Sequence, residues 1–290
     1  MSIKNVSFVG LGVMGYPMAG HLQKNGYNVT VFNRTESKAK KWVEEYGGQM
    51  GKTPNEACFN AEIVFMCVGR DEDIIEVMEG DNGILSSAKE GLIIVDHTTA
   101  SAEIARTYFA KLQKRNVAFL DAPISGGQAG AENGALSIMI GGEENDFEVV
   151  KPVLQSYGKA IELIGPSGSG QIAKMINQIC IAGLVQGLSE AMAFGKKAKV
   201  DMEKVLSVIS KGAAQSWQME NRYRTMIDGK FDYGFAVDWM RKDLSICFNE
   251  AKKNGASLPI TEIVDKYYEE VQKNGGNRLD TSSLMTLVDK

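Results

Sequence analysis

The first 165 residues alternate between short apolar runs and segments with helical spacing. Runs at 6–9, 28–32 and 63–68 are rich in β-branched or aromatic residues, which favours strands. The same pattern predicts further strands at 92–95, 118–120, 136–140 and 161–164. Several runs are apolar throughout, as in parallel strands that are covered on both faces. Strands that alternate with helices predict an α/β fold with a doubly wound sheet of the Rossmann type.

Helices are predicted between these runs, and they are the main predicted element in the rest of the chain. In the first part, helical periodicity predicts helices at 16–25, 36–46, 73–78 and 102–115. Beyond residue 165 strand signals nearly vanish, and helices are predicted at 171–197, 202–210, 239–253 and 259–273. We therefore expect an α/β domain at 1–165 and a mostly α domain at 166–290 that starts with one long helix.

Composition and charge indicate which classes of partner are not expected. The 290 residues carry a net charge of −4 without a long basic run, so neither nucleic acid nor an anionic membrane is an expected partner. No apolar run approaches the ~20 residues of a membrane span, and no signal peptide is visible. Four cysteines without a C-x-x-C pair indicate reduced core thiols in a cytoplasmic protein. His21 and His97 lack ligands at metal spacing, so no metal is expected.

A glycine loop joins the first predicted strand to the first helix. It reads Gly10-Leu11-Gly12-Val13-Met14-Gly15, the G-x-G-x-x-G spacing of dinucleotide-binding folds. There Gly10 makes the tight turn, Gly12 lets the backbone approach the pyrophosphate, and Gly15 lets the helix pack on the strand. The helix N-terminus then faces the phosphates. Cys67 and Val68 end another strand and are expected beside the same cofactor. The alternative is a plain strand-to-helix turn.

The end of the second strand indicates which dinucleotide is bound. An Asp or Glu at this point would bind the ribose 2′-hydroxyl of NAD, but the sequence has Asn33, followed by Arg34 and Thr35. A guanidinium suits a 2′-phosphate through paired, charge-assisted hydrogen bonds. NADP is therefore the predicted cofactor. The alternatives are that Arg34 is a solvated turn residue, or that the protein also uses NAD.

Four motifs together resemble the β-hydroxyacid dehydrogenases, the 3-hydroxyisobutyrate dehydrogenase family. They occur in family order along nearly the whole chain: the glycine loop, Asp121-Ala-Pro-Ile-Ser-Gly-Gly127, Gly168-Ser-Gly-Gln-Ile-Ala-Lys-Met-Ile-Asn-Gln178 and Lys242-Asp243-Leu244. The resemblance implies a dinucleotide-binding domain at 1–165, a long interdomain helix, and an all-α domain at 166–290 that binds substrate and forms oligomer contacts. It implies reversible oxidation of a β-hydroxy acid to its semialdehyde and assembly as a homodimer or homotetramer. It also implies that Thr99 and Lys242 contact the cofactor. The turn after Phe32 is similar to that of the NADP-using glyoxylate and succinic semialdehyde reductases.

Lys174 is the candidate catalytic residue. Oxidation of an alcohol by hydride transfer needs a base for the hydroxyl proton, and the reverse reaction needs an acid. A dry site or a nearby positive charge lowers the pKa of a lysine from ~10.4 and suits it to both roles. In the family, the catalytic lysine occupies the position of Lys174. The alternative is a solvated helix lysine.

The remaining candidates would bind the substrate. Ser125, Gly126 and Gly127 follow a strand end, where their N–H groups and the serine hydroxyl can surround a carboxylate. Asn177 and Gln178 lie three and four residues after Lys174, on the same helical face. Asp243, with Lys242, could close the site. A flexible turn at 125–127 and a surface ion pair at 242–243 are the alternatives.

Other functions fit less well. An NAD-dependent 3-hydroxyisobutyrate dehydrogenase or a tartronate semialdehyde reductase is the main alternative. The 6-phosphogluconate dehydrogenases are much longer, and imine reductases usually lack the lysine at position 174. A non-catalytic protein that senses dinucleotides would not need Lys174. The small carboxylate-bearing substrate itself is not specified, because semialdehydes that differ by one methylene are separated by only ~1–3 kcal/mol of pocket contacts.

Overall fold

The computed structural model describes residues 3–289 and contains two compact units, which divide within one long helix after Lys174. Nine strands occur in the first unit: β1 (Asn5–Val9), β2 (Asn28–Phe32), β3 (Gln49–Met50), β4 (Ile63–Met66), β5 (Ile93–Asp96), β6 (Ala118–Asp121), β7 (Ile124–Ser125), β8 (Leu136–Gly141) and β9 (Gly158–Gly165). Its helices are α1 (Gly15–Lys24), α2 (Glu36–Tyr46), α3 (Pro54–Cys58), α4 (Asp71–Glu79), a 3₁₀ turn (Ile84–Ser86), α5 (Ala102–Gln113), α6 (Gly127–Glu132) and α7 (Glu144–Leu154).

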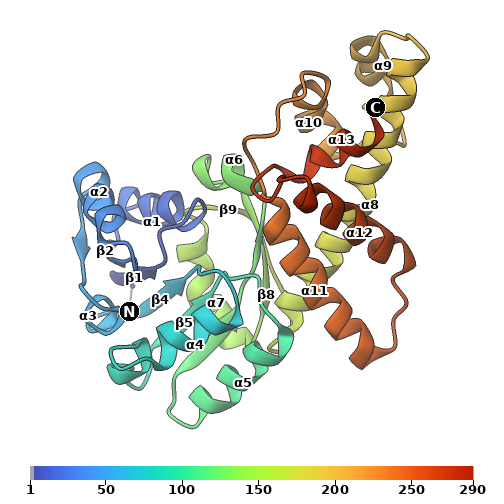
Figure 1. Ribbon diagram of the computed structural model, residues 1–290. Coiled ribbons are helices and arrows are strands. Elements are labelled where there is room, and N and C mark those ends of the chain that lie inside the picture. Colours follow the sequence, from blue (N-terminus) through green and yellow to red (C-terminus); the bar gives the residue numbers. More distant parts are fainter. Residues whose placement is uncertain (1–2, 290) are drawn as a thin grey trace. The chain divides into compact units, whose positions relative to one another are not determined.

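The strands of the first unit form one sheet in the order β3-β2-β1-β4-β5-β6-β8-β7, with β9 also paired to β8. Figure 1 labels β1, β2, β4, β5, β8 and β9 of this sheet. The pairs from β3 through β6 are parallel, whereas β8 runs antiparallel to β6 and β7. The order reverses direction at β1, as in a doubly wound sheet. The predicted fold class, including the long helix and the helical C-terminal region, is confirmed.

Helices cover both faces of the sheet and create two cores. Successive side chains of a strand point to opposite faces, and β1 follows this rule: Val6 and Phe8 belong to one core, Val9 to the other. The first core contains residues of α1, α2 and α7, and the second contains residues of α4 and α5. Because both faces are buried, central strands such as β4 (Ile63–Met66) are apolar throughout, and ligands of such sheets bind at the carboxyl ends of the strands.

The second unit is helical. It contains most of α8 (Ser169–Lys197), then α9 (Met202–Ile209), α10 (Trp217–Ile227), α11 (Val237–Asn254), α12 (Pro259–Lys273), a 3₁₀ turn (Thr281–Leu284) and α13 (Met285–Val288). One core joins α8, α11 and α12 through Val185, Leu244 and Tyr268. A second core joins α8, α9 and α10 through Met192, Leu206 and Met226.

Several elements differ from the predictions. The helices α7 and α10 are missing from the predicted set. Pro152 lies inside α7 and interrupts the sequence signal, although burial of Phe147 and Val150 stabilises the helix. Among the cysteines, Cys58 and Cys247 are buried as expected, but Cys180 is exposed, so the expectation of core thiols is wrong there.

The long helix α8 bears on the expectation that the chain has no membrane-spanning segment. Its 29 residues and a mean hydropathy of 1.2 over 18 residues make it long and apolar enough to cross a membrane by composition alone. Such a helix is weak evidence for a span, because core helices pass the same test, and 44% of that window is buried within the protein.

Candidate active site

The glycine loop has a distinct steric role for each glycine. Gly10 has φ +97°, and a Cβ there would lie 2.3 Å from the carbonyl oxygen of Cys67. A Cβ on Gly15 would lie 2.0 Å from the carbonyl oxygen of Gly10 and 2.8 Å from the ring of Phe8. A Cβ on Gly12 would meet nothing described within 4 Å. The protein backbone therefore needs glycine at the two ends of the loop, while the middle glycine borders open space.

The start of α1 is suited to an anion. Among the described residues, no side chain caps this helix at Met14, so its first N–H groups and its dipole can face a ligand phosphate. Val13 is exposed at the loop, whereas the side chain of Leu11 is buried. These features fit the pyrophosphate of a dinucleotide.

Asn33 and Arg34 in the turn after β2 make different contacts. The Asn33 Oδ1 accepts a hydrogen bond from the Leu11 N–H (2.9 Å), and Asn33 Nδ2 donates to the Thr35 carbonyl (3.0 Å). Asn33 therefore braces the glycine loop. The guanidinium of Arg34 lies 3.7 Å from the Asp73 carboxylate and 3.8 Å from that of Glu76, and its side chain is 80% exposed.

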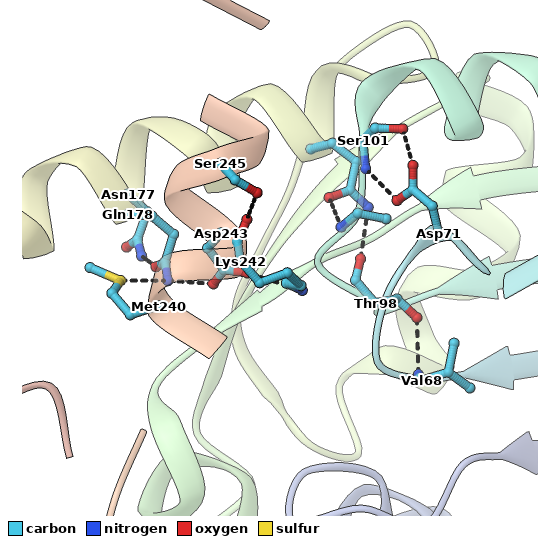
Figure 2. A network of polar contacts seen from close by, with 12 residues as sticks. Val68, Asp71, Thr98, Ser101, Asn177, Gln178, Met240, Lys242, Asp243 and Ser245 are labelled. Carbon is cyan, nitrogen blue, oxygen red and sulfur yellow. Dashed lines mark hydrogen bonds and ion pairs between the residues drawn. The ribbon is translucent and has the colours of Figure 1, made fainter. Parts of the chain in front are cut away.

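The ends of β4 and β5 are joined by Thr98. Its hydroxyl accepts a hydrogen bond from the Val68 N–H (3.0 Å), and its own N–H donates to the Asp96 carboxylate (2.9 Å). Figure 2 shows Val68 and Thr98 with Ser101, whose N–H and hydroxyl both donate to Asp71 (2.9 and 2.5 Å). The loop that holds Thr99 is thus tied to its neighbours on both sides.

The first turn of α8 is held by a buried carboxylate at the end of β6. Asp121 accepts hydrogen bonds from the N–H groups of Gly168 (2.7 Å) and Gln171 (2.9 Å). Burial raises the pKa of Asp121, while these N–H donors oppose that shift. The Gln171 side chain reaches back to the loop after β5: its Oε1 accepts from the Ala100 N–H (3.0 Å) and its Nε2 donates to the Thr98 carbonyl (2.8 Å).

Lys174 follows on the same helix and is 8% exposed. Gln171 and Gln178, three residues before it and four after, are also buried. Positions i, i+3 and i+7 share one face of a helix. Three buried polar side chains therefore share one face of α8, and the burial of Lys174 is unlike the solvated lysine of the alternative interpretation.

The turn at Ser125 requires glycine. Ser125 ends β7, and the next two residues have φ values of +136° (Gly126) and +62° (Gly127). Such values are unfavourable for residues with a Cβ. The short helix α6 begins at Gly127.

In the second unit, Gln178 joins two other predicted site residues. Its Oε1 accepts from Asn177 Nδ2 (2.8 Å), and its Nε2 donates to the buried carboxylate of Asp243 (2.7 Å). The other Asp243 oxygen lies 3.0 Å from Lys242 Nζ (Figure 2). The amide of Gln178 is occupied at both atoms, so its geometry suits bracing of Asp243.

Two buried titratable groups end β5. Burial raises the pKa of Asp96 from 3.8 to about 7, against the opposing bonds from Thr98. Burial lowers the pKa of His97 to about 4. The neutral ring of His97 donates from Nδ1 to the Ala122 carbonyl (2.6 Å) and accepts at Nε2 from the Tyr157 hydroxyl (2.8 Å). His97 is therefore a structural link between strand ends.

Sequence reasoning did not assign Asp96, Thr98, Asp121 or Gln171 to the site. Asp96 and Asp121 each end a strand, which is a usable signal because ligands bind at carboxyl ends. Gln171 lies one helical turn before Lys174, but its partners are about seventy positions away in sequence.

Among residues 3–289, no group of three His, Cys, Asp or Glu side chains could hold a metal ion.

Both parts of the chain match family models. Residues 5–165 match the NAD binding domain of 6-phosphogluconate dehydrogenase. Residues 168–288 match the NAD-binding domain of NADP-dependent 3-hydroxyisobutyrate dehydrogenase.

Individual relatives cover nearly the whole chain. An uncharacterized oxidoreductase of Shewanella frigidimarina is 58% identical over 98% of each chain. The 2-hydroxy-3-oxopropionate reductase of Escherichia coli is 34% identical over 98% of this chain and 97% of its own. The crystal structure of 3-hydroxyisobutyrate dehydrogenase from Salmonella typhimurium superposes with a TM-score of 0.87 at 26% identity, covering 98% of this chain and 99% of that one.

The glycine loop yields a paired prediction. Gly15→Ala forces a Cβ against the Gly10 carbonyl and should lower the free energy of unfolding by roughly 1–3 kcal/mol. Gly12→Ala meets no described atom within 4 Å and should unfold like wild type. It should nevertheless weaken dinucleotide binding at least about tenfold, which corresponds to ~1.4 kcal/mol. Urea unfolding and NADPH fluorescence titration measure the two effects; normal dinucleotide affinity in Gly12→Ala would contradict the assignment.

Asp96 predicts a pH dependence of stability. Because its pKa is raised to about 7 in the folded protein, the native state holds this proton more tightly than the unfolded chain between about pH 4 and 7. Stability from this group is therefore lost as pH rises through that window. Relative to Asp96→Asn, wild type should lose up to about 1.4 kcal/mol per pH unit there. Urea unfolding of both proteins from pH 4 to 8 tests this, and parallel curves would argue against it.

Proposed function

Because the chain belongs to the 3-hydroxyisobutyrate dehydrogenase family of β-hydroxyacid dehydrogenases, we propose that it transfers a hydride between NADP(H) and a short β-hydroxy acid or its semialdehyde. The observation that carries the proposal is the buried Lys174. It lies one helical turn after Gln171, whose side chain bonds to Thr98 and Ala100 on either side of Thr99. This arrangement puts an ionisable group in the same unit as the glycine loop.

Each residue has a defined task in the proposed reaction. When bound, the nicotinamide supplies or accepts the hydride. Lys174 Nζ donates a proton to the aldehyde oxygen in reduction and removes the hydroxyl proton in oxidation. The Ser125 hydroxyl and the N–H groups of Gly126 and Gly127 bind the substrate carboxylate. Thr99 borders the nicotinamide, and Asn177 orients the substrate from the turn after Lys174.

NADP is the proposed cofactor, with NAD as the alternative. Support comes from Asn33, where a neutral amide stands in place of the carboxylate that would bind a ribose 2′-hydroxyl. Arg34 is exposed and available to a 2′-phosphate. The reductase type of the family, acting on glyoxylate or succinic semialdehyde, is proposed over a dehydrogenase that uses NAD or a tartronate semialdehyde reductase.

The protein is proposed to act as a cytoplasmic homodimer or homotetramer, with no nucleic acid or membrane partner. Exposed apolar side chains in the helical unit support assembly, above all Phe194 on α8 (77% exposed) and Val208 on α9 (71% exposed). Contact with a second copy of the chain would remove this apolar surface from water, which favours association.

Lys174→Ala tests the catalytic role. Loss of the proton donor should lower kcat by about 10²–10⁴-fold, with the Kd for NADPH unchanged. The assay is NADPH oxidation with glyoxylate and with the succinic, tartronate and methylmalonate semialdehydes, and the reverse reaction with their hydroxy acids.

The matched control is Lys197→Ala, which changes an exposed lysine of the same helix and should retain wild-type turnover. Turnover of Lys174→Ala within tenfold of wild type would refute the role. Tight NADPH binding without turnover of any substrate by wild type would instead favour a dinucleotide sensor.

Asn33→Asp tests the cofactor. The carboxylate retains an acceptor for the Leu11 N–H but repels a 2′-phosphate and can bind a 2′-hydroxyl. We expect the ratio of kcat/KM for NADP to that for NAD to fall by about 10–100-fold, the range of one charge-assisted hydrogen bond. Arg34→Ala should lower only the value for NADP. An unchanged NADP efficiency in both variants would exclude the turn as the determinant.

A further inference from the structure

The side chain of Gln171 makes two hydrogen bonds to one short segment. Its Oε1 accepts from the Ala100 N–H (3.0 Å), and its Nε2 donates to the Thr98 carbonyl (2.8 Å). The two partners lie on either side of Thr99, and the side chain is 1% exposed. A carboxamide offers a donor and an acceptor on one planar, uncharged group, so Gln171 can make both bonds at once.

Gln171 is itself held in place. Its backbone N–H donates to Asp121 at the end of β6 (2.9 Å). The segment that it binds is tied on its far side, where the Thr98 hydroxyl accepts from the Val68 N–H (3.0 Å) (Figure 2). Gln171 therefore connects the loop after β5 and the end of β6 to the first turn of α8, and Thr98 extends this network to the end of β4. Buried polar networks in which every group is bonded are rigid.

Lys174 lies three residues after Gln171 and therefore on the same face of α8. We propose that Gln171 is a positioning residue that sets the Thr99 loop, and with it the nicotinamide, relative to the ammonium of Lys174. This inference rests on the proposed function. Hydride and proton must move to adjacent atoms of one carbonyl, so the two donors have to be aligned at the same time. A misplacement of 1 Å can cost about 10²-fold in rate.

Gln171→Met tests the inference because methionine has a similar length but makes neither hydrogen bond. We expect kcat to fall by about 10²-fold, with little change in the KM for NADPH. With NADPH that carries deuterium at the transferred position, the isotope effect on kcat should increase, because hydride transfer becomes rate-limiting. A variant that is only less stable would change neither the isotope effect nor the KM.

Gln186→Met is the matched control. Gln186 is also buried on α8, but its side chain bonds only to Glu190 of the same helix (2.7 Å) among the contacts described. This variant should keep the wild-type kcat and isotope effect. If Gln171→Met does not fold, Gln171→Glu replaces it, since the carboxylate retains an acceptor for the Ala100 N–H but, when ionised, cannot donate to the Thr98 carbonyl.

Hydrogen exchange at the Ala100 amide gives a readout that does not need turnover. Exchange should be faster in Gln171→Met than in wild type, both with NADPH present. A folded variant with wild-type kcat, isotope effect and Ala100 exchange would overturn the inference. Inactivity of wild type on every substrate would refute the proposed function instead, and the exchange measurement would still decide whether Gln171 holds the loop.

Discussion

The buried carboxylate of Asp121 determines where α8 begins, and the candidate catalytic groups on that helix depend on it. Asp121 is fully buried, and its oxygens accept from the N–H groups of Gly168 and Gln171. These donors and the helix dipole offset the cost of burying the carboxylate. The approach is possible because two neighbours lack side chains: a Cβ on Gly141 would lie 2.6 Å from Asp121 Oδ1, and one on Gly170 2.4 Å from the Met139 carbonyl oxygen. The end of β6 and the start of α8 are therefore one rigid joint.

Strand pairing in the parallel sheet and hydrogen bonds between the loops both position the candidate site. Register aligns the strand ends, since Met66 of β4 pairs with Asp96 of β5, and Asp96 pairs with Asp121 of β6. Two hydrogen bonds to Thr98, from the Val68 N–H and from Gln171 Nε2, then hold the loops that continue from these ends. Strand spacing alone leaves a loop free to rotate, whereas two or three bonds to its backbone give it one conformation.

Local patterns predicted the sheet and the glycine loop because each signal lies within a few residues. Apolar runs identified the strands, and the roles of Gly10 and Gly15 follow from spacing. The amide of Asn33 was assigned to the cofactor, but its hydrogen bond to the Leu11 N–H spans 22 positions and no spacing rule describes it. The clamp by Gln171 spans more than 70 positions and depends on how β5 and α8 pack. Long-range polar contacts of this kind require the folded chain.

For the proposed NADP cofactor, the turn after β2 offers a weak ion pair and a neutral amide. Arg34 is exposed, and its distances to Asp73 and Glu76 exceed those of direct hydrogen bonds. Exposed pairs of this kind contribute little to stability, so the guanidinium can turn toward a phosphate at little cost. The larger effect then belongs to Asn33: its amide braces the loop as an aspartate could, but without a charge that would repel a 2′-phosphate. Under the proposed NADP specificity, selectivity would depend more on the missing negative charge at position 33 than on the positive charge of Arg34.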